Sequence, residues 1–217
     1  MIKIFKLKNL LLIACATLVF NACSSKEDQE FNKPADYWYN KMLKQITSGD
    51  LDKADDTYSS LESEHRNSPY IQSAMLILIN AHIDEEEYAL ANFYLDEYIK
   101  RFSLSKDIDY ARYLKIKANF LGFKYQFREQ QLIEDTLVQI KDFKEKYTNS
   151  PYMPLVDTMN SRLFMAKAKM DQEISDLYKR RDKEFASKYY EDKVKSSWVD
   201  PTEIEPVKVP KYRALFE

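Results

Sequence analysis

The chain has 217 residues with 33 basic and 35 acidic side chains, and its formal net charge is −2. This balance gives no reason to expect nucleic-acid binding or attraction to anionic lipid. Only two glycines occur, and hairpin turns depend on glycine, so a β protein is disfavoured. The 16 tyrosines and 12 phenylalanines suit a helical protein that packs aromatic rings between its helices.

The N-terminus has the regions of a secretory signal peptide. Residues 1–9 contain three lysines and no acid, and residues 10–20 are apolar except for Thr17. This apolar run is shorter than the roughly 20 residues that span a bilayer, so a retained transmembrane anchor is the weaker alternative. We expect residues 1–22 to be a signal peptide and the polar residues 23–33 to be a flexible tether.

The end of the signal, Phe20-Asn21-Ala22-Cys23, resembles a lipobox with phenylalanine in place of the usual leucine. Cys15 fits the bare motif better, but cleavage before it would leave an apolar stump. We therefore expect cleavage before Cys23 and acylation of this cysteine, with an incidental cysteine as the alternative. Several acyl chains hold a protein at a membrane more firmly than one chain does. Ser24, which is not aspartate, favours delivery to the outer membrane.

Three segments align and repeat one pattern: Leu51–Tyr70, Tyr88–Asp107 and Ile133–Tyr152. Their first, fourth, eighth, eleventh and fifteenth positions trace one face of an α-helix. The fourth position is small in each copy (Ala54, Ala91 and Thr136) and would let a neighbouring helix approach closely. Two of the copies end in Asn-Ser-Pro-Tyr, which is a helix-start signal.

Each copy follows another expected helix: Tyr37–Thr47, Ile71–Ile83 or Tyr110–Tyr125. Such pairs are typical of a helix–turn–helix solenoid. Trp38, Gly49-Asp50-Leu51 and Tyr58 fall on signature positions of the tetratricopeptide repeat, which the pattern resembles. The fold class expected for residues 34–196 is therefore all-α, a tetratricopeptide-like helical-hairpin solenoid; unrelated hairpins with coincidental spacing are the alternative.

The C-terminal part combines a long helix with a proline-rich tail. A heptad-like stripe runs from Val156 to Phe185 and predicts one long helix or two nearly continuous ones, broken near Arg180-Arg181-Asp182. Prolines at positions 201, 206 and 210 prevent a regular helix beyond them. We expect residues 197–217 to form an extended strap and candidate partner-binding tail, anchored by Trp198, Tyr212 and Phe216.

No constellation typical of catalysis is apparent. His65 and His82 are interpreted as packing residues, and two histidines without a free cysteine disfavour a zinc site. The acidic run Asp84–Glu87 is interpreted as a solvated turn, and Asp55-Asp56 as part of an exposed helix face. The sequence contains no phosphate loop and no nucleophile elbow. We expect no enzyme, no metal and no cofactor other than a covalent lipid on Cys23.

A binding surface is the remaining kind of site. A helical-repeat solenoid exposes a face of its first helices that suits extended peptides. Core packing is an equally good interpretation of the leucines on this face. The candidate peptide groove consists of Tyr39, Leu43, Leu76, Asn80, Leu121 and Tyr125.

Several phrases resemble the BamD family of outer-membrane assembly lipoproteins. These are Tyr37–Asn40, Gly49–Ala54, Asp96–Phe102, Asp109–Lys115 and Tyr147–Tyr152. The resemblance implies a lipid-anchored scaffold on the periplasmic face of the outer membrane. It also implies binding to the periplasmic domains of a BamA-like barrel protein and help in inserting unfolded β-barrel precursors. Family members commonly carry about five repeats, so the shorter C-terminus here would remodel the BamA contact.

Another tetratricopeptide lipoprotein scaffold is the alternative function, such as a pilus-secretin pilotin or an envelope-division organiser. An enzyme is the third and weakest class.

Overall fold

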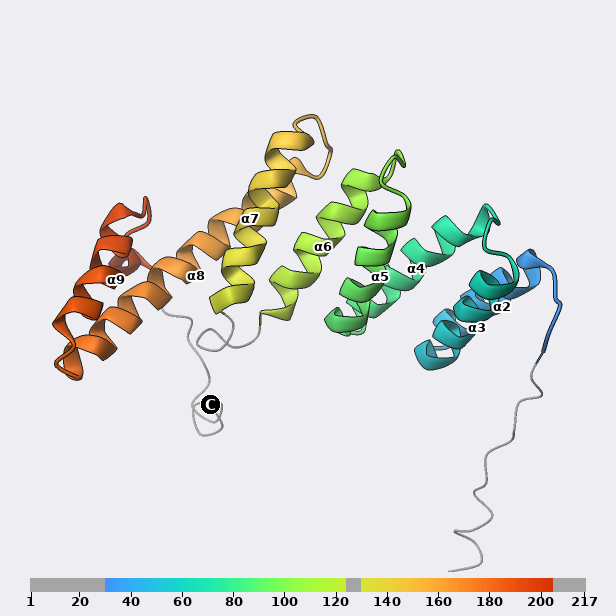
Figure 1. The fold of residues 1–217 in the computed structure, drawn as a ribbon, viewed down its shortest axis with the longest axis horizontal. Coiled ribbons are helices and arrows are strands. Elements are labelled where there is room, and N and C mark those ends of the chain that lie inside the picture. Colours follow the sequence, from blue (N-terminus) through green and yellow to red (C-terminus); the bar gives the residue numbers. More distant parts are fainter. Residues whose placement is uncertain (1–29, 124–129, 205–217) are drawn as a thin grey trace, which may run out of the picture. The chain divides into compact units, whose positions relative to one another are not determined.

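The structure is a computed structural model that describes residues 30–123 and 130–204. Within these ranges all regular structure is helical, so the expected all-α class is confirmed (Figure 1). Cys23, Tyr125, Tyr212 and Phe216 lie outside the described residues. Among the described helices, none combines the length and apolar character needed to cross a membrane.

The described helices follow one another as antiparallel pairs in chain order, and each helix packs against the next (Figure 1). The first helices of the pairs also contact one another, α2 with α4, α4 with α6, and α6 with α8. The bounds are α2 (Ala35–Thr47), α3 (Leu51–Glu64), α4 (Tyr70–Asp84), α5 (Tyr88–Arg101), α6 (Ile108–Gly122), α7 (Gln130–Lys146), α8 (Met153–Arg180), α9 (Glu184–Ser196) and the 3₁₀ turn η1 (Pro201–Glu203).

The turn inside three of these pairs has the same backbone geometry. Gly49, Glu86 and Asp182 take positive φ angles of 76°, 62° and 55°. The next residue donates its N–H to the carbonyl five residues back, as in a Schellman helix end. Glu86 and Asp182 adopt a conformation that costs non-glycine residues about 1–2 kcal/mol. The shared turn identifies α8 and α9 as a fourth repeat-like pair.

The three aligned segments occupy equivalent places, as predicted. Their small fourth positions are fully enclosed, since Ala54 and Ala91 are 0% exposed and Thr136 is 1% exposed. The eighth and eleventh positions are also buried. Trp38 lies on the first helix at the position expected from the repeat, and its indole N–H donates to Glu64 Oε2 at 2.8 Å. The tetratricopeptide-like register is therefore confirmed.

Of the two alternatives predicted for this region, the one with a break near Arg180-Arg181-Asp182 is found: α8 ends at Arg180, and α9 returns along α8. Ser175 on α8 and Ser187 on α9 are buried, and the Ser175 hydroxyl donates to the Ser187 carbonyl at 3.0 Å. The continuous apolar stripe predicted to Phe185 is wrong, because this ring lies past the turn and is 91% exposed. Small residues instead let the two helices approach.

Two buried clusters form the core. One extends from α2 to α6 and the other from α6 to α8, and the half-buried Tyr113 packs against both. After α9 the chain is held by the buried Val199 and Pro201. Trp198, the predicted anchor, contacts the edge of Phe164 and is 69% exposed. The start of the strap is therefore held by Val199 and Pro201 more than by Trp198.

Candidate peptide-binding face

The first helices carry tyrosines at or near their starts, and these rings meet across the repeats. Tyr39 on α2 stacks on Tyr70 at the start of α4, with ring centroids 4.9 Å apart and planes 26° apart. Tyr70 remains 37% exposed, whereas Tyr39 is half-buried against the first core cluster. This pair joins the first two repeats and leaves aromatic surface open to solvent.

A second aromatic group joins α6 to the start of α8. The rings of Tyr113 and Tyr152 stack with centroids 4.8 Å apart and planes 9° apart. Tyr110 lies 5.1 Å from Tyr152 and 6.2 Å from Tyr113. Burial raises the pKa of Tyr113 and of Tyr152, and the neighbouring Tyr110 raises both further. The two phenols therefore stay neutral and able to donate hydrogen bonds.

A polar contact connects the second aromatic group to α4. The Tyr110 hydroxyl donates to Asn80 Oδ1 at 3.0 Å, and Asn80 Nδ2 donates to the Leu76 carbonyl at 2.7 Å. Leu121 lies on the α6 face that also carries Tyr110 and Tyr113, and it is 38% exposed. We define the tyrosine face as Tyr39, Leu43, Tyr70, Leu76, Asn80, Tyr110, Tyr113, Leu121 and Tyr152.

Five of the six residues predicted for a peptide groove lie on the first helices α2, α4 and α6, and Tyr125 lies outside the described residues. That these residues bind a peptide stays a prediction. Leu43 and Leu76 pack against the first core cluster, which supports the core-packing interpretation for these two. The prediction missed Tyr70, Tyr110, Tyr113 and Tyr152. The recurring Asn-Ser-Pro-Tyr joint was a usable signal, because it places a tyrosine at the start of a first helix.

Hydrogen bonds connect a first helix to the joint that precedes the next first helix. Gln72 Nε2 on α4 donates to the Tyr98 hydroxyl at 2.8 Å and to Ser105 Oγ at 2.5 Å. One joint later, Ser150 Oγ donates to Asp109 Oδ2 at 2.7 Å. Rigid joints of this kind hold the tyrosine rings in place and reduce the entropy lost on binding a ligand.

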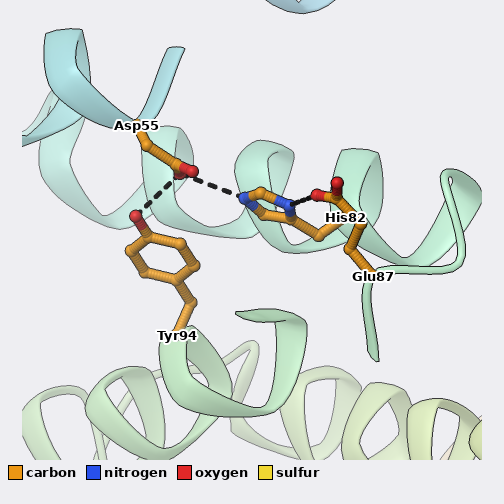
Figure 2. A network of polar contacts seen from close by, with 4 residues as sticks. All are labelled: Asp55, His82, Glu87 and Tyr94. Carbon is orange, nitrogen blue, oxygen red and sulfur yellow. Dashed lines mark hydrogen bonds and ion pairs between the residues drawn. The ribbon is translucent and has the colours of Figure 1, made fainter. Parts of the chain in front are cut away.

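A separate polar network centres on His82, which is 0% exposed. Figure 2 shows the imidazole between two carboxylates, with Nε2 3.0 Å from Asp55 Oδ1 and Nδ1 2.6 Å from Glu87 Oε2. The Tyr94 hydroxyl donates to the same Asp55 oxygen at 2.7 Å. The network joins α3, α4 and the start of α5.

Burial lowers the pKa of His82, but hydrogen bonds to Asp55 and Glu87 outweigh this effect and raise the pKa above 6.5. Burial also raises the pKa of Tyr94, and the hydrogen bond to Asp55 adds to the rise. The protonated imidazole can donate to both carboxylates at once. This arrangement suits a structural clamp between repeats, because neither ring nitrogen is left to act on a substrate.

One prediction about acidic residues is wrong. Asp55 was expected on an exposed face, yet its side chain is only 22% exposed and contacts His82 and Tyr94. The reason is that α4 and α5 cover the side of α3 that its own sequence leaves polar. The acidic run Asp84–Glu87 is exposed, as predicted, and Glu87 in addition binds the His82 ring. Among the described residues, no group of three or more histidine, cysteine or acidic side chains could hold a metal.

The paired helices, shared turns and repeat register define a tetratricopeptide-like helical-repeat scaffold. Residues 32–192 match the family YfiO, described as outer membrane lipoprotein. The chain belongs to this family, which confirms the resemblance and the expected outer-membrane location. Acylation of Cys23 stays a prediction.

Three relatives of this chain share the name outer membrane protein assembly factor BamD. The chain is 37% identical over 213 residues to the outer membrane protein assembly factor BamD of Helicobacter pylori, covering 97% of each chain. It is 24% identical to the BamD proteins of Pasteurella multocida and Haemophilus influenzae, over 82% and 81% of this chain and 72% and 71% of theirs. The similarity therefore extends through the helical repeats and beyond them.

Proposed function

We propose that this chain is an assembly factor for outer-membrane proteins, which binds unfolded β-barrel precursors on its tyrosine face and docks on a BamA-like barrel protein. The observation that carries the proposal is the presence of two stacked tyrosine groups, one between α2 and α4 and one between α6 and α8, in a chain similar over nearly its whole length to a BamD protein. Assembly by such a scaffold needs binding and release and no covalent chemistry.

The composition of the tyrosine face suits an extended, partly apolar peptide. Tyrosine offers a large contact area with little conformational entropy to lose, and its hydroxyl can bond to peptide groups. Strands of a barrel precursor alternate apolar and polar side chains. Such a strand could place its apolar side chains on the rings and its backbone polar groups near the tyrosine hydroxyls.

Binding to the face can be tested with a labelled peptide from the C-terminal strand of an outer-membrane barrel protein. Tyr70→Ala removes a ring that is 37% exposed, so we expect about a fivefold or greater rise in Kd, the usual effect of losing a contact residue. Tyr189→Ala on α9 is the matched control, because this ring is 54% exposed and lies off the face. Equal Kd values for both variants would count against the face.

The proposed anchor and partner have their own experiment. The full-length protein is cross-linked in its native outer membrane and purified, beside a Cys23→Ala variant. We expect a BamA-like barrel protein to be recovered with the acylated form, and the variant to leave the membrane fraction. Recovery of a secretin or a division protein without a barrel partner would favour the alternative scaffold.

A further inference from the structure

A recess of about 160 Å³ is lined by side chains of three successive helices, α5, α6 and α7 (Figure 1). No residue of the tyrosine face lines it. We call it the Arg112 recess, and its lining residues are Asp96, Ile99, Arg112, Lys115, Ile116 and Gln139.

The charged side chains of the Arg112 recess do not balance. Lys115 Nζ is paired with Asp96 Oδ1, so these two charges cancel. Within residues 30–123 and 130–204, the guanidinium of Arg112 has neither a carboxylate partner nor a hydrogen-bond acceptor. The recess therefore carries one uncompensated positive charge.

This charge can be reached from solvent. Arg112 lines the recess, and of its guanidinium nitrogens only Nε is enclosed without an acceptor. The two terminal nitrogens, which form the fork of the guanidinium, are not enclosed in this way. An anion in the recess can therefore meet the fork without entering the core.

A chain of amide hydrogen bonds supplies a second donor. Asn92 Nδ2 donates to Asn119 Oδ1 at 2.9 Å, and Asn119 Nδ2 donates to Gln139 Oε1 at 3.1 Å. Asn119 is only 7% exposed, so the chain is held in place between the helices. Because Gln139 accepts through Oε1, its Nε2 is left to donate, and in the described part of the chain it has no acceptor. Hydrogen bonds in series polarise one another and strengthen the last donor.

These donors select a carboxylate among anions. The fork of a guanidinium matches the two oxygens of a carboxylate. One surplus positive charge is neutralised by one negative charge, whereas a phosphate dianion would leave a negative charge uncompensated beside Asp96. The small volume of the recess also suits a group of this size.

Apolar side chains flank the recess on α5. Leu90 and Phe93 precede Asp96 at intervals of three residues, which places all three on one side of the helix. Leu90 is 42% exposed and Phe93 is 60% exposed. A small free carboxylate would leave this surface uncovered, but a protein segment that carries the carboxylate can also cover the rings and methyl groups.

We propose that the Arg112 recess binds an acidic side chain in a segment of a partner protein, with an apolar side chain of the same segment on Phe93. Phe93 and Asp96 are about one helical turn apart, or roughly 5 Å along α5. An extended segment places alternate side chains on one side at intervals of about 6.5–7 Å. An apolar residue two positions from an acidic residue therefore fits both contacts.

The test uses the full chain labelled with ¹⁵N and a peptide of this pattern, N-acetyl-Phe-Ala-Glu amide. The matched neutral peptide is N-acetyl-Phe-Ala-Gln amide. The signals followed are the Nε–H group of Arg112 and the side-chain amide of Gln139, each identified by its loss in a variant. We expect saturable shifts of both signals with the glutamate peptide, half-complete on the order of 1 mM, and no shift with the neutral peptide.

Variants locate the interaction. Arg112→Gln removes the charge and should weaken binding about fivefold or more. Gln139→Glu keeps the acceptor for Asn119 but replaces the donor with a negative charge, so it should also weaken binding without disturbing the arginine. Phe93→Ala removes the exposed ring and should weaken binding to a smaller extent. Arg162→Gln on α8 is the control, because Arg162 is exposed and lies outside the recess.

Three outcomes would overturn the proposal. Equal responses to the glutamate and glutamine peptides would show that the carboxylate is not recognised. Unchanged affinity in both Arg112→Gln and Gln139→Glu, or an equal loss in Arg162→Gln, would show that binding does not occur in this recess. Tighter binding of N-acetyl-Phe-Ala-Gln with a free C-terminal carboxylate would show that the recess takes a chain end and not an acidic side chain.

Discussion

His82 on α4 and Asp55 on α3 form a buried contact between neighbouring repeats, with 3.0 Å between Nε2 and Oδ1. Glu87 holds the other ring nitrogen at 2.6 Å, and the Tyr94 ring stacks beside the imidazole at 5.6 Å between centroids. One imidazole thus connects the helices of the first two repeats. Two carboxylate partners favour the charged form of a histidine, so this imidazole contributes through its charge.

Replacing His82 should therefore loosen the junction of the first two repeats. His82→Gln removes the cation and leaves Asp55, which is 22% exposed, without a charged partner. We expect a loss of about 2 kcal/mol in the free energy of unfolding, in the range of hydrogen bonds to charged groups. Denaturant titration followed by circular dichroism measures this loss.

His65→Gln is the control for that experiment, because the His65 side chain is 32% exposed and lies at the end of α3. It should change the free energy of unfolding by about 0.5 kcal/mol or less. A loss as large as that of His82→Gln would show that the network has no special role.

The same network predicts a direction for pH dependence. The pKa of His82 is raised above its ordinary value of 6.5 by Asp55 and Glu87. A raised folded-state pKa stabilises the fold fully below pH 6.5, and the contribution disappears as pH rises through the folded value. The difference in stability between the parent chain and His82→Gln should shrink from pH 6 to pH 9. A difference that stays constant over this range would contradict the charged state of the ring.

The helix faces were predictable because apolar spacing alone defines them. Ala54, Ala91 and Thr136 are 0%, 0% and 1% exposed, as their common register implied. Asp55 illustrates what that register omits. Its neighbour Ala54 faces the core, so the pattern placed Asp55 outside, but a helix from the next repeat covers that side. Contacts between repeats depend on packing angles that a single sequence does not encode locally.

The fourth helix pair shows a similar limit. Asp182 takes a φ of 55°, and a non-glycine residue gives little local sign of such a conformation. The sequence placed a break nearby but left its geometry open. The residues of the tyrosine face were likewise predicted only in part. Its tyrosines lie at or near helix starts, and a pattern that looks for apolar faces along a helix does not single them out there.

Gln72 should be important for the joint between α4 and α5. Gln72→Ala removes the donor to the hydroxyl of Tyr98, a ring that is 0% exposed. An unsatisfied buried hydroxyl costs about 1–2 kcal/mol, so the free energy of unfolding should fall by this amount. Ser73→Ala, the next residue and exposed, should change it by about 0.5 kcal/mol or less. Equal stability of the two variants would mean that the joint is held by packing alone.

A larger side chain at the small fourth position of the repeat should destabilise the fold. Ala91 is 0% exposed within the first core cluster, so Ala91→Leu inserts a larger side chain where the packing leaves no space. Overpacking of this kind costs about 1–3 kcal/mol, which thermal unfolding should report as a lower Tm. Ala89→Leu is the matched control on the same helix, because Ala89 is exposed. If Ala91→Leu were as stable as Ala89→Leu, close helix approach at this position would not define the repeat.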